Sequence, residues 1–342
     1  MGLQINEIVP RKAIEFSELK GKTIAIDAYN TIYQFLSTIR QPDGTPLMDS
    51  KKRITSHLSG LFYRNVNLLT EGMKLIYIFD GKPPALKFGT NVMRSERKEE
   101  AKEKYEKAKS EEDVEGMGKY ARQTVRLTAE IIDDSKRLLE ALGIAVIQAP
   151  SEGESQAAEI SKKSAWAVGS QDYDSLLFGA PRLIQNLTLA RKRKVATGYV
   201  YISPELIELE HVLNTLQINL DQLICLGILA GTDYNPGGIR GIGQKKALEI
   251  VKKYREPYLI FKSVESKLLE QENNFDWQEI YELFHKPDVI KNAEINFPKV
   301  NEQEIKKILV EEHDFSLERV ENTLKKLHEL REKKKQKTLF TY

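Results

Sequence analysis

Short apolar runs alternate with helix-like periodicity through the first half of the chain. The runs are rich in aliphatic side chains and only a few residues long, which is typical of buried strands. They cover residues 23–26, 75–79, 145–148 and 165–168. Residues 31–39 and 54–69 instead place apolar side chains three and four positions apart, which predicts amphipathic helices. Strands that alternate with helices predict an α/β fold with a mixed, mainly parallel central sheet flanked by helices.

The pattern changes between residues 94 and 137, where Glu and Lys alternate with i,i+4 spacing around a glycine-containing loop. This spacing favours solvated helices and is unlike a piece of core. We therefore expect a helical excursion inserted between two strands of the sheet, and such insertions often carry function. An exposed, salt-bridged pair of helices is the alternative interpretation.

Helical patterns dominate the rest of the sequence. They are predicted for residues 204–216, 220–230 and 244–254, and the polar stretch up to residue 332 also has a helical pattern. The basic cluster at residues 191–194 is interpreted as a solvated loop.

Composition narrows the class of protein. The 342 residues are 41% hydrophobic, enough to bury a substantial core, and no apolar run approaches the ~18 residues of a membrane span. Cys225 is the only cysteine, so neither an intramolecular disulfide nor a thiolate metal cluster can form. The N-terminus has no apolar signal segment, and we expect a cytoplasmic, intracellular protein, nuclear if the source is eukaryotic. A net charge of +2 with 30% charged residues excludes a simple polycation but allows segregated acidic and basic surfaces.

Seven carboxylates lie beside turns or at the ends of predicted elements. They are Asp27, Asp80, Glu152, Glu154, Asp172, Asp174 and Asp233. Ligands bind outside the carboxyl ends of parallel strands, so acids at that edge can converge on one cleft. Oxygen-only ligand sets suit Mg²⁺ or Mn²⁺ rather than zinc. Two such ions about 3.5–4 Å apart can activate a water and stabilise the leaving oxygen of a phosphodiester.

The acids also have ordinary structural interpretations. Ser151 with Glu154 three residues later has the pattern of a helix capping box. Asp172 and Asp174 can be loop acids that follow a strand. Neither pair is specific alone, and the metal site is predicted from the convergence of all seven.

A glycine-rich segment precedes the helix predicted at 244–254. Its residues Gly238, Arg240, Gly241 and Gly243 let backbone N–H groups approach a phosphate at a helix N-terminus. Lys245 and Lys246 follow directly, and we expect contacts to a DNA backbone that do not depend on base sequence. A plain glycine turn is the alternative. A dinucleotide-binding loop is disfavoured because a helix, not a strand, precedes the segment.

These motifs together resemble those of the structure-specific 5′ flap endonucleases of archaeal type. The blocks IAIDAYNTIYQFL, TSHLSGLFYR, YIFDGKPPALK, APSEGESQAA, GSQDYDSLLFG and GTDYNPGGIRGIGQKKAL occur in the order and spacing of that family. The resemblance implies a magnesium-dependent phosphodiesterase whose seven carboxylates hold two Mg²⁺ ions, which Mn²⁺ can replace. It also implies a K⁺ ion at the glycine segment, which corresponds to a helix-two-turn-helix that grips downstream duplex.

The resemblance assigns roles to further residues. Lys87 and Arg94 match the basic pair that contacts the scissile phosphate, and Tyr33 matches an aromatic that stacks on the nucleotide near the cut. Gly2 becomes the N-terminus if Met1 is removed, and its amine would lie near the site. The charged excursion corresponds to a helical arch through which a 5′ single strand passes.

The implied organisation is one nuclease domain, 1–330, followed by a flexible tail, 331–342. The domain divides into an N-terminal region of residues 1–93, the arch of residues 94–137, an internal region of residues 138–258 with the helix-two-turn-helix, and a C-terminal helical region of residues 259–330. The tail resembles the family's sliding-clamp motif through Gln336, Leu339, Phe340 and Tyr342. Its second aromatic position is missing because the sequence stops at Tyr342, and Phe340 has an unusual place.

The expected activity is hydrolysis at the base of 5′ DNA flaps, with 5′-3′ exonuclease activity, in Okazaki-fragment maturation and DNA repair, by a monomer. Three alternatives stay open. One is a non-catalytic scaffold that binds DNA junctions and the sliding clamp, and another is a mainly exonucleolytic or gap-cutting member of the same family. The third, a haloacid-dehalogenase-type phosphatase with Asp27 as nucleophile, is disfavoured because Tyr29 stands where a second Asp is needed.

Overall fold

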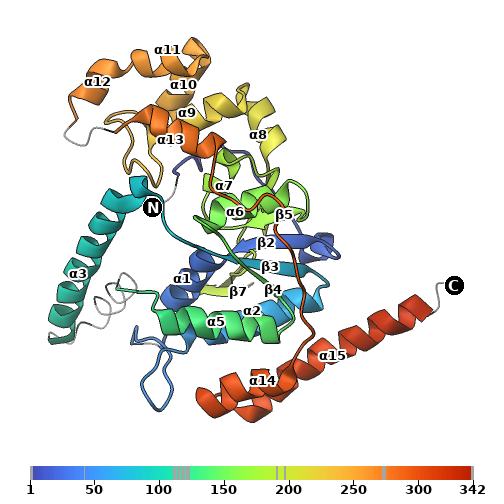
Figure 1. Cartoon of the computed structure of the whole chain (residues 1–342). Coiled ribbons are helices and arrows are strands. Elements are labelled where there is room, and N and C mark those ends of the chain that lie inside the picture. The colour runs from blue at the N-terminus through green and yellow to red at the C-terminus, as the bar shows by residue number, and fades with distance from the viewer. Residues whose placement is uncertain are drawn as a thin grey trace.

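The computed structural model places a twisted sheet at the centre of the chain, with helices on both faces (Figure 1). It describes residues 3–339 except 42, 111–112, 114–115, 117–119, 121–123, 190–191, 196–197 and 272–274. Side chains are described outside residues 88–95, 109–110, 192–195, 199 and 330–339.

The sheet has seven strands in the order β1-β9-β6-β5-β2-β3-β4. The strands are β1 (Lys12–Ala13), β2 (Thr23–Asp27), β3 (Lys74–Phe79), β4 (Ala145–Gln148), β5 (Ala167–Gly169), β6 (Arg182–Gln185) and β9 (Glu205–Glu208). Strands β2 to β6 run parallel, and β9 and β1 join antiparallel at one edge. The predicted mixed, mainly parallel α/β fold is confirmed. Because β2 pairs with β3 on one side and β5 on the other, the strand order reverses beside β2, and ligands bind at such a point.

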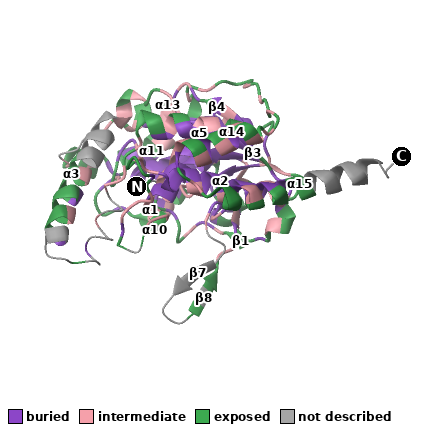
Figure 2. Ribbon diagram, turned by 90° about the horizontal axis from the view of Figure 1, so that it is seen from below, coloured by how far each residue is buried: buried purple, intermediate pink, exposed green. Residues whose placement is uncertain are grey.

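Side chains along the strands point alternately to the two faces of the sheet, and each face carries a hydrophobic core. Ile24 and Ile26 of β2 face one core, where α1 (Ala28–Thr38), α2 (Ser56–Thr70) and α5 (Ala129–Ala141) pack. Ala25 between them faces the other core, which α6 (Gly153–Ser161), α7 (Asp174–Leu177) and α9 (Leu220–Ala230) cover. Side chains of successive strand residues point to opposite faces, so one short run fills both layers. Figure 2 shows this buried centre beneath exposed helices.

A helical lobe continues from α9. It consists of α8 (Leu209–Leu216), α10 (Gln244–Tyr254), α11 (Pro257–Lys262), α12 (Glu265–Leu269) and α13 (Trp277–His285). Among the described residues, no single helix is long and apolar enough to cross a bilayer. Helices α8 and α9 meet the length and composition criteria only as a pair, and they are bent by 81°.

The charged excursion differs in extent from its prediction. A three-residue turn, η2 (Ala85–Lys87), leads into α3 (Phe88–Ser110), which stands away from the body in Figure 1. The last portion of the predicted arch, however, belongs to α5, whose Ile131, Leu138 and Leu139 are buried in the core. The segment that projects therefore begins before residue 94 and ends before α5.

Two other stretches were predicted wrongly. Residues 204–216 were predicted as one helix, but β9 occupies 205–208 before α8 begins. The sequence of β9, Glu-Leu-Ile-Glu, is too short to separate the periods of strand and helix, and pairing with β6 decides it. Residues 192–194 of the basic cluster, predicted as a loop, instead belong to β7 (Lys192–Val195), which pairs with β8 (Gly198–Tyr201) in a hairpin.

The C-terminal segment returns along the first core. It comprises α14 (Glu302–Lys306), η3 (Lys307–Glu312) and α15 (Leu317–Leu339), and Ile305, Leu309 and Val320 are buried against α2 and α5. The backbone of α15 stays helical to Leu339, although a flexible tail was predicted from residue 331.

Candidate active site

A cleft of about 300 Å³ opens at the carboxyl ends of β2, β3, β4 and β5. Six of the seven predicted carboxylates line it: Asp27, Asp80, Glu152, Glu154, Asp172 and Asp233. Tyr33 and Lys87 line it too. The seventh acid, Asp174, is buried at the start of α7, and its charge interacts with Asp233 and Asp172. Residues scattered over more than half of the sequence thus meet in one place.

Asp27 and Asp172 are linked across the point where the strand order reverses. Asp27 is the last residue of β2, and its side chain caps α1 by accepting a hydrogen bond from the backbone N–H of Asn30, at 3.0 Å. The side-chain amide of Asn30 donates to Asp172 Oδ2 at 2.7 Å. Asn30 was not among the predicted site residues, although it lies in the quoted block that contains Asp27. It fixes two carboxylates relative to each other.

Asp80 and the acids of α6 meet through backbone contacts. Asp80 Oδ1 accepts a hydrogen bond from the N–H of Gly153 at 2.7 Å, and a Cβ on Gly153 would lie only 2.7 Å from the same oxygen. A larger residue at position 153 would therefore push the Asp80 carboxylate away from the start of α6. Glu154, one residue later, accepts a hydrogen bond from Ser170 Oγ at 2.9 Å. The predicted capping box of Ser151 does not form, since Glu152 is at the N-cap position and its side chain makes no capping hydrogen bond.

Among the described side chains, the ammonium of Lys87 lies between these acids. It pairs with Glu152 and lies 3.3 Å from Asp233 Oδ2. Burial opposes its charge, but the attraction of Glu152 and Asp233 outweighs burial and raises the pKa of Lys87. Lys87 therefore stays charged, and its position in the cleft suits contact with an anionic group.

The carboxylates crowd one another inside the protein. Burial first, and neighbouring carboxylates second, hold the pKa of Asp27 and of Glu154 well above the usual range and raise that of Asp174 to about 8. Asp174 Oδ1 is buried and has no hydrogen-bond partner among the described residues. Two like charges about 4 Å apart cost roughly 4 kcal/mol at an effective dielectric near 20. An oxygen-only cluster with this excess of negative charge fits hard divalent cations such as Mg²⁺ or Mn²⁺.

The glycine segment lies between α9 and α10. Gly238 (φ 58°) and Gly241 (φ 77°) adopt the left-handed region that favours glycine, and Gly243 is the N-cap of α10. Arg240, Lys245 and Lys246 are positioned beside it, with Arg240 and Lys246 exposed and the Lys245 side chain 74% exposed. The backbone N–H groups at the N-terminus of α10 lie beside three cationic side chains. This arrangement is suited to binding a phosphate group.

Two family descriptions match the chain. The XPG N-terminal domain matches residues 3–101, and the XPG I-region matches residues 143–233. Flap endonuclease 1 of Pyrococcus furiosus is 52% identical over 99% of this chain and 98% of its own length. The chain belongs to the flap endonuclease 1 family. The predicted resemblance is thereby confirmed.

Other members and relatives agree with this assignment. Flap endonuclease 1 of Sulfolobus acidocaldarius is 51% identical over 95% of this chain and 94% of its own length. The solved structure of flap endonuclease-1 from Methanococcus jannaschii is similar with a TM-score of 0.75 at 41% identity, covering 97% of this chain and all of that one. The catalytic core of Rad2 in complex with a DNA substrate has a TM-score of 0.71, covering 96% of this chain and all of that one, but at 20% identity it shows the shared fold alone.

Some residues expected from the family lie partly or wholly outside the described residues. Arg94 is on α3, seven positions after Lys87, but its side chain is not described, and Gly2 is outside the described residues. Tyr33, by contrast, is placed: its ring lies 5.0 Å from Lys98 Nζ, and its hydroxyl accepts a hydrogen bond from that ammonium at 3.1 Å. Of the predicted clamp residues, Gln336 and Leu339 lie on the helical backbone of α15 without described side chains. Phe340 and Tyr342 are not described.

A second cluster of acids and histidine lies apart from the cleft. Buried His313 stands between Asp49, 3.2 Å from Nδ1, and Asp134, 3.2 Å from Nε2. Glu312 is close enough to complete a three-residue metal set, but Arg137 engages both of its oxygens at 2.9 and 3.0 Å. We interpret the cluster as a latch that fastens the C-terminal segment to α5 and to the loop before α2. Sequence reasoning missed it, because no motif joins residues so far apart.

Proposed function

We propose that this chain is a metal-dependent nuclease that hydrolyses the phosphodiester backbone at the base of 5′ DNA flaps. The observation that supports this most directly is the cleft in which carboxylates from separate segments surround Lys87. Membership of the flap endonuclease 1 family supports the substrate class. A non-catalytic scaffold would have no need for so many buried, mutually repelling acids.

The seven carboxylates would hold two Mg²⁺ ions, which Mn²⁺ can replace. Asn30 links Asp27 to Asp172, and Asp80 and Glu152 line the same cleft. When bound, a pair of such ions makes water nucleophilic near neutral pH and neutralises charge on the leaving oxygen. Some of the seven acids would act through bound water, because Mg²⁺ dehydrates reluctantly.

The remaining groups of the cleft would position the scissile phosphate. The ammonium of Lys87 lies among the acids and can neutralise charge that develops on the phosphate, a contribution of about 10²–10³ in rate for one well-placed donor. Arg94 would add a second cation from the first turns of α3. Tyr33, which lines the same cleft, offers a ring on which a nucleotide next to the cut can stack.

Duplex DNA would be held by its backbone. The N-terminus of α10 is expected to contact phosphates of the downstream duplex together with Arg240, Lys245 and Lys246. The glycine segment would also bind a K⁺ ion. Specificity would then come from the shape of the junction, with the single strand passing beside α3. The C-terminal end of α15 would bind a sliding clamp, and the protein would act as a monomer in replication and repair.

A cleavage assay tests this function. Labelled single-flap, nicked, bubble and single-stranded DNAs are incubated with protein and Mg²⁺, and cut positions are mapped to the nucleotide. We expect cutting at the base of the flap, with 5′ phosphate and 3′ hydroxyl products, that EDTA abolishes. Binding of flap DNA without cleavage in Mg²⁺ or Mn²⁺ would support the scaffold instead, and loss of nucleotides from the 5′ end alone would support a mainly exonucleolytic enzyme.

A further inference from the structure

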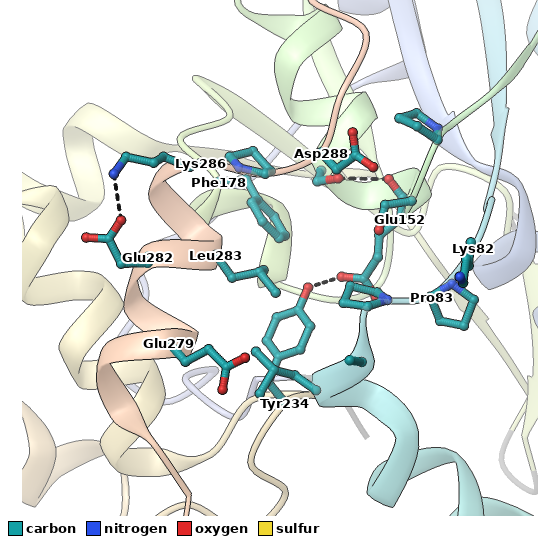
Figure 3. A pocket seen from close by; sticks show the side chains of 17 residues that line it. Lys82, Pro83, Glu152, Phe178, Tyr234, Glu279, Glu282, Leu283, Lys286 and Asp288 are labelled. Carbon is teal, nitrogen blue, oxygen red and sulfur yellow. Dashed lines mark hydrogen bonds and ion pairs between the residues drawn. The ribbon is translucent and has the colours of Figure 1, made fainter.

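Tyr234 contacts Glu152 and Lys87, two paired residues of the catalytic cleft. It is buried, with 7% of its surface exposed, and its hydroxyl donates a hydrogen bond to Glu152 Oε2 (Figure 3). Its ring centroid lies 5.8 Å from the ammonium of Lys87, a distance at which a cation is attracted to the ring face. The rings of Tyr234 and Phe284 pack edge-to-face, with their centroids 5.4 Å apart. One side chain thus contacts both a predicted metal ligand and the cation expected to meet the phosphate.

Glu152 lines two cavities, the catalytic cleft and a second one on the side of Tyr234. A second cavity of about 540 Å³ lies next to the catalytic cleft, and Glu152 and Tyr234 form part of its wall together with Phe178 and Leu283 (Figure 3). Long side chains lose conformational entropy when they are fixed, so a carboxylate beside open space needs a partner to stay in one rotamer. The Tyr234 hydroxyl supplies that partner from the cavity side, and Lys87 supplies another from the cleft side.

The turn that carries Tyr234 is itself locked. Asn235 Oδ1 accepts hydrogen bonds from the N–H and hydroxyl of Thr232, at 3.1 and 2.7 Å, and its amide donates to the carbonyl of Ile228 at 2.7 Å. The N–H of Tyr234 donates to Thr232 Oγ1 at 3.2 Å. These buried bonds tie the turn, including Asp233, to the end of α9. Asp233 and Tyr234 are therefore held in place relative to the end of α9.

The glycine segment touches the end of α9 and the same turn through its backbone. A Cβ on Gly238 would lie 2.4 Å from the carbonyl oxygen of Leu229, and a Cβ on Gly231 would lie 2.7 Å from the nitrogen of Gly238. The N–H of Ile239 donates to the Leu229 carbonyl at 2.9 Å. Because no side chain separates these backbones, a displacement of the segment that holds duplex is passed to the turn at 231–235.

We propose that Tyr234 is a positioning residue that couples the duplex-holding glycine segment to the catalytic cleft. Occupation of the segment by duplex fixes the turn, and the Tyr234 hydroxyl and ring then hold Glu152 and Lys87 in the arrangement that the reaction needs. This inference rests on the proposed function, since it assigns Tyr234 a role in the same cleavage. Tyr234 itself does not contact the reacting atoms.

The variant Tyr234→Phe tests the coupling, because it keeps the ring and removes only the hydroxyl. Tyr77→Phe is the matched control: Tyr77 is also buried and loses one hydrogen bond, 2.8 Å to Asn65, inside the core away from the cleft. A hydrogen bond to a charged group corresponds to a roughly 10- to 100-fold effect on an equilibrium or rate. We expect Tyr234→Phe to lower the single-turnover cleavage rate by about tenfold or more while its Kd for flap DNA changes by less than about twofold. Tyr77→Phe should lower thermal stability by at least as much and leave the rate unchanged.

Two further measurements separate positioning from a general loss of structure. Calorimetric titration with Ca²⁺, without DNA, should show weaker binding in Tyr234→Phe and unchanged binding in Tyr77→Phe. Shortening the downstream duplex so that it no longer reaches the glycine segment should slow the wild type but hardly affect Tyr234→Phe, since the connection is already broken.

The outcomes are distinct. If Tyr234→Phe cleaves at the same rate as the wild type and depends on the duplex in the same way, the coupling is overturned. The proposed function stands in that case, because the wild type still cuts flaps. The coupling is also overturned if both tyrosine variants lose the same fraction of the cleavage rate and their melting temperatures fall in parallel. Tyr234 would then contribute to stability alone. If the wild type cuts no flap DNA at all, the proposed function fails first.

Discussion

The side-chain amide of Asn30 lies 2.7 Å from Asp172 Oδ2, although the two residues are 142 positions apart in the sequence. Asn30 is in the first turn of α1, directly after β2, and Asp172 follows β5, the parallel neighbour of β2. The chain moves outward from β2 through β3 to β4 before it returns to β5 on the opposite side. The contact therefore closes the place where the strand order reverses, and carboxylates from both halves of the sheet meet there.

Replacing Asn30 by Ala should weaken the site without unfolding the protein. The backbone N–H of residue 30, which donates a hydrogen bond to Asp27, is retained, so the cap of α1 survives. Asp172, however, loses the neutral side-chain donor that orients it. Groups that orient metal ligands typically contribute about 10- to 100-fold to metal affinity or activity. We expect the Mg²⁺ concentration for half-maximal cleavage to rise by about that factor, with little change in melting temperature. An unchanged metal midpoint in Asn30→Ala would contradict the orienting role.

Asp174→Asn should abolish cleavage and, in the absence of metal, stabilise the protein. The carboxylate of Asp174 is buried among other acids, and its Oδ1 has no hydrogen-bond partner among the described residues. Asparagine has nearly the same shape and removes one of the repelling charges, which we expect to add about 1–3 kcal/mol to the free energy of unfolding. Melting in EDTA measures the gain, and a flap-cleavage assay measures the loss.

Asp133→Asn, at an exposed acid on α5, is the control for this substitution and should change neither quantity. DNA binding by Asp174→Asn should stay close to that of the wild type. Destabilisation of the metal-free protein by Asp174→Asn would mean that the carboxylate has a favourable partner and that the cluster is not strained.

The residues that could be predicted from sequence share a local signal. Asp27 and Asp80 each follow an apolar run, so a parallel sheet alone brings them to one edge. Contacts made by side chains from distant elements had no such signal. Tyr234 has the pattern of a core aromatic, and only the fold shows that its hydroxyl reaches Glu152.

The errors in element boundaries have the same origin. β9 exists because β6 offers an edge with which four residues can pair, which periodicity over so short a stretch does not reveal. The beginning of α5 is highly charged in sequence, like the arch before it. Only the burial of Ile131 and Leu138 in the core shows that this helix belongs to the main body of the protein and not to the arch. Tertiary packing, not local preference, decided both cases.

Lys245→Ala should reduce the salt dependence of DNA binding. Lys245 is in the first turn of α10, next to the glycine segment. Its side chain is 74% exposed, and its ammonium lies 3.0 Å from the exposed carboxylate of Glu7. Each phosphate that a cation neutralises contributes about −0.9 to the slope of log K against log salt on duplex DNA. We expect the slope for a nicked duplex to become less steep by about that amount.

Lys286→Ala offers a comparison for this measurement. Lys286 is similarly exposed but follows α13 and pairs with Glu282 on the wall of the second cavity. It should leave the slope unchanged. If both lysines change the slope equally, the DNA contacts are spread over the whole helical lobe and not concentrated at the start of α10.

The latch around His313 should make the protein sensitive to acid. Hydrogen bonds and charge from Arg53, with His313, outweigh burial and lower the pKa of Asp49. In the same way a hydrogen bond and charge from His313, with charge from Arg137, outweigh burial and lower the pKa of Asp134. A carboxyl with a lowered pKa in the folded state stabilises that state above its ordinary pKa, and this stabilisation is lost as the pH falls. The C-terminal segment is therefore expected to detach at acidic pH.

His57 adds to this sensitivity and allows it to be tested. Burial, partly offset by Asp134, lowers the pKa of His57 from 6.5 to about 3, and neither ring nitrogen has a hydrogen-bond partner among the described residues. Between these two values the unfolded chain binds a proton that the folded protein does not. Stability should therefore fall with decreasing pH, by at most about 1.4 kcal/mol per pH unit from this group.

Replacing His57 by Leu removes the titrating ring from its buried position on α2. Urea unfolding at several pH values below 6.5 should then show a shallower loss of stability than in the wild type, while the contribution of Asp49 and Asp134 remains at lower pH. His211→Leu, at an exposed histidine on α8, should keep the wild-type slope. An equal slope in His57→Leu and wild type would show that His57 takes up a proton in the folded protein, and its buried surroundings would then have to open without global unfolding.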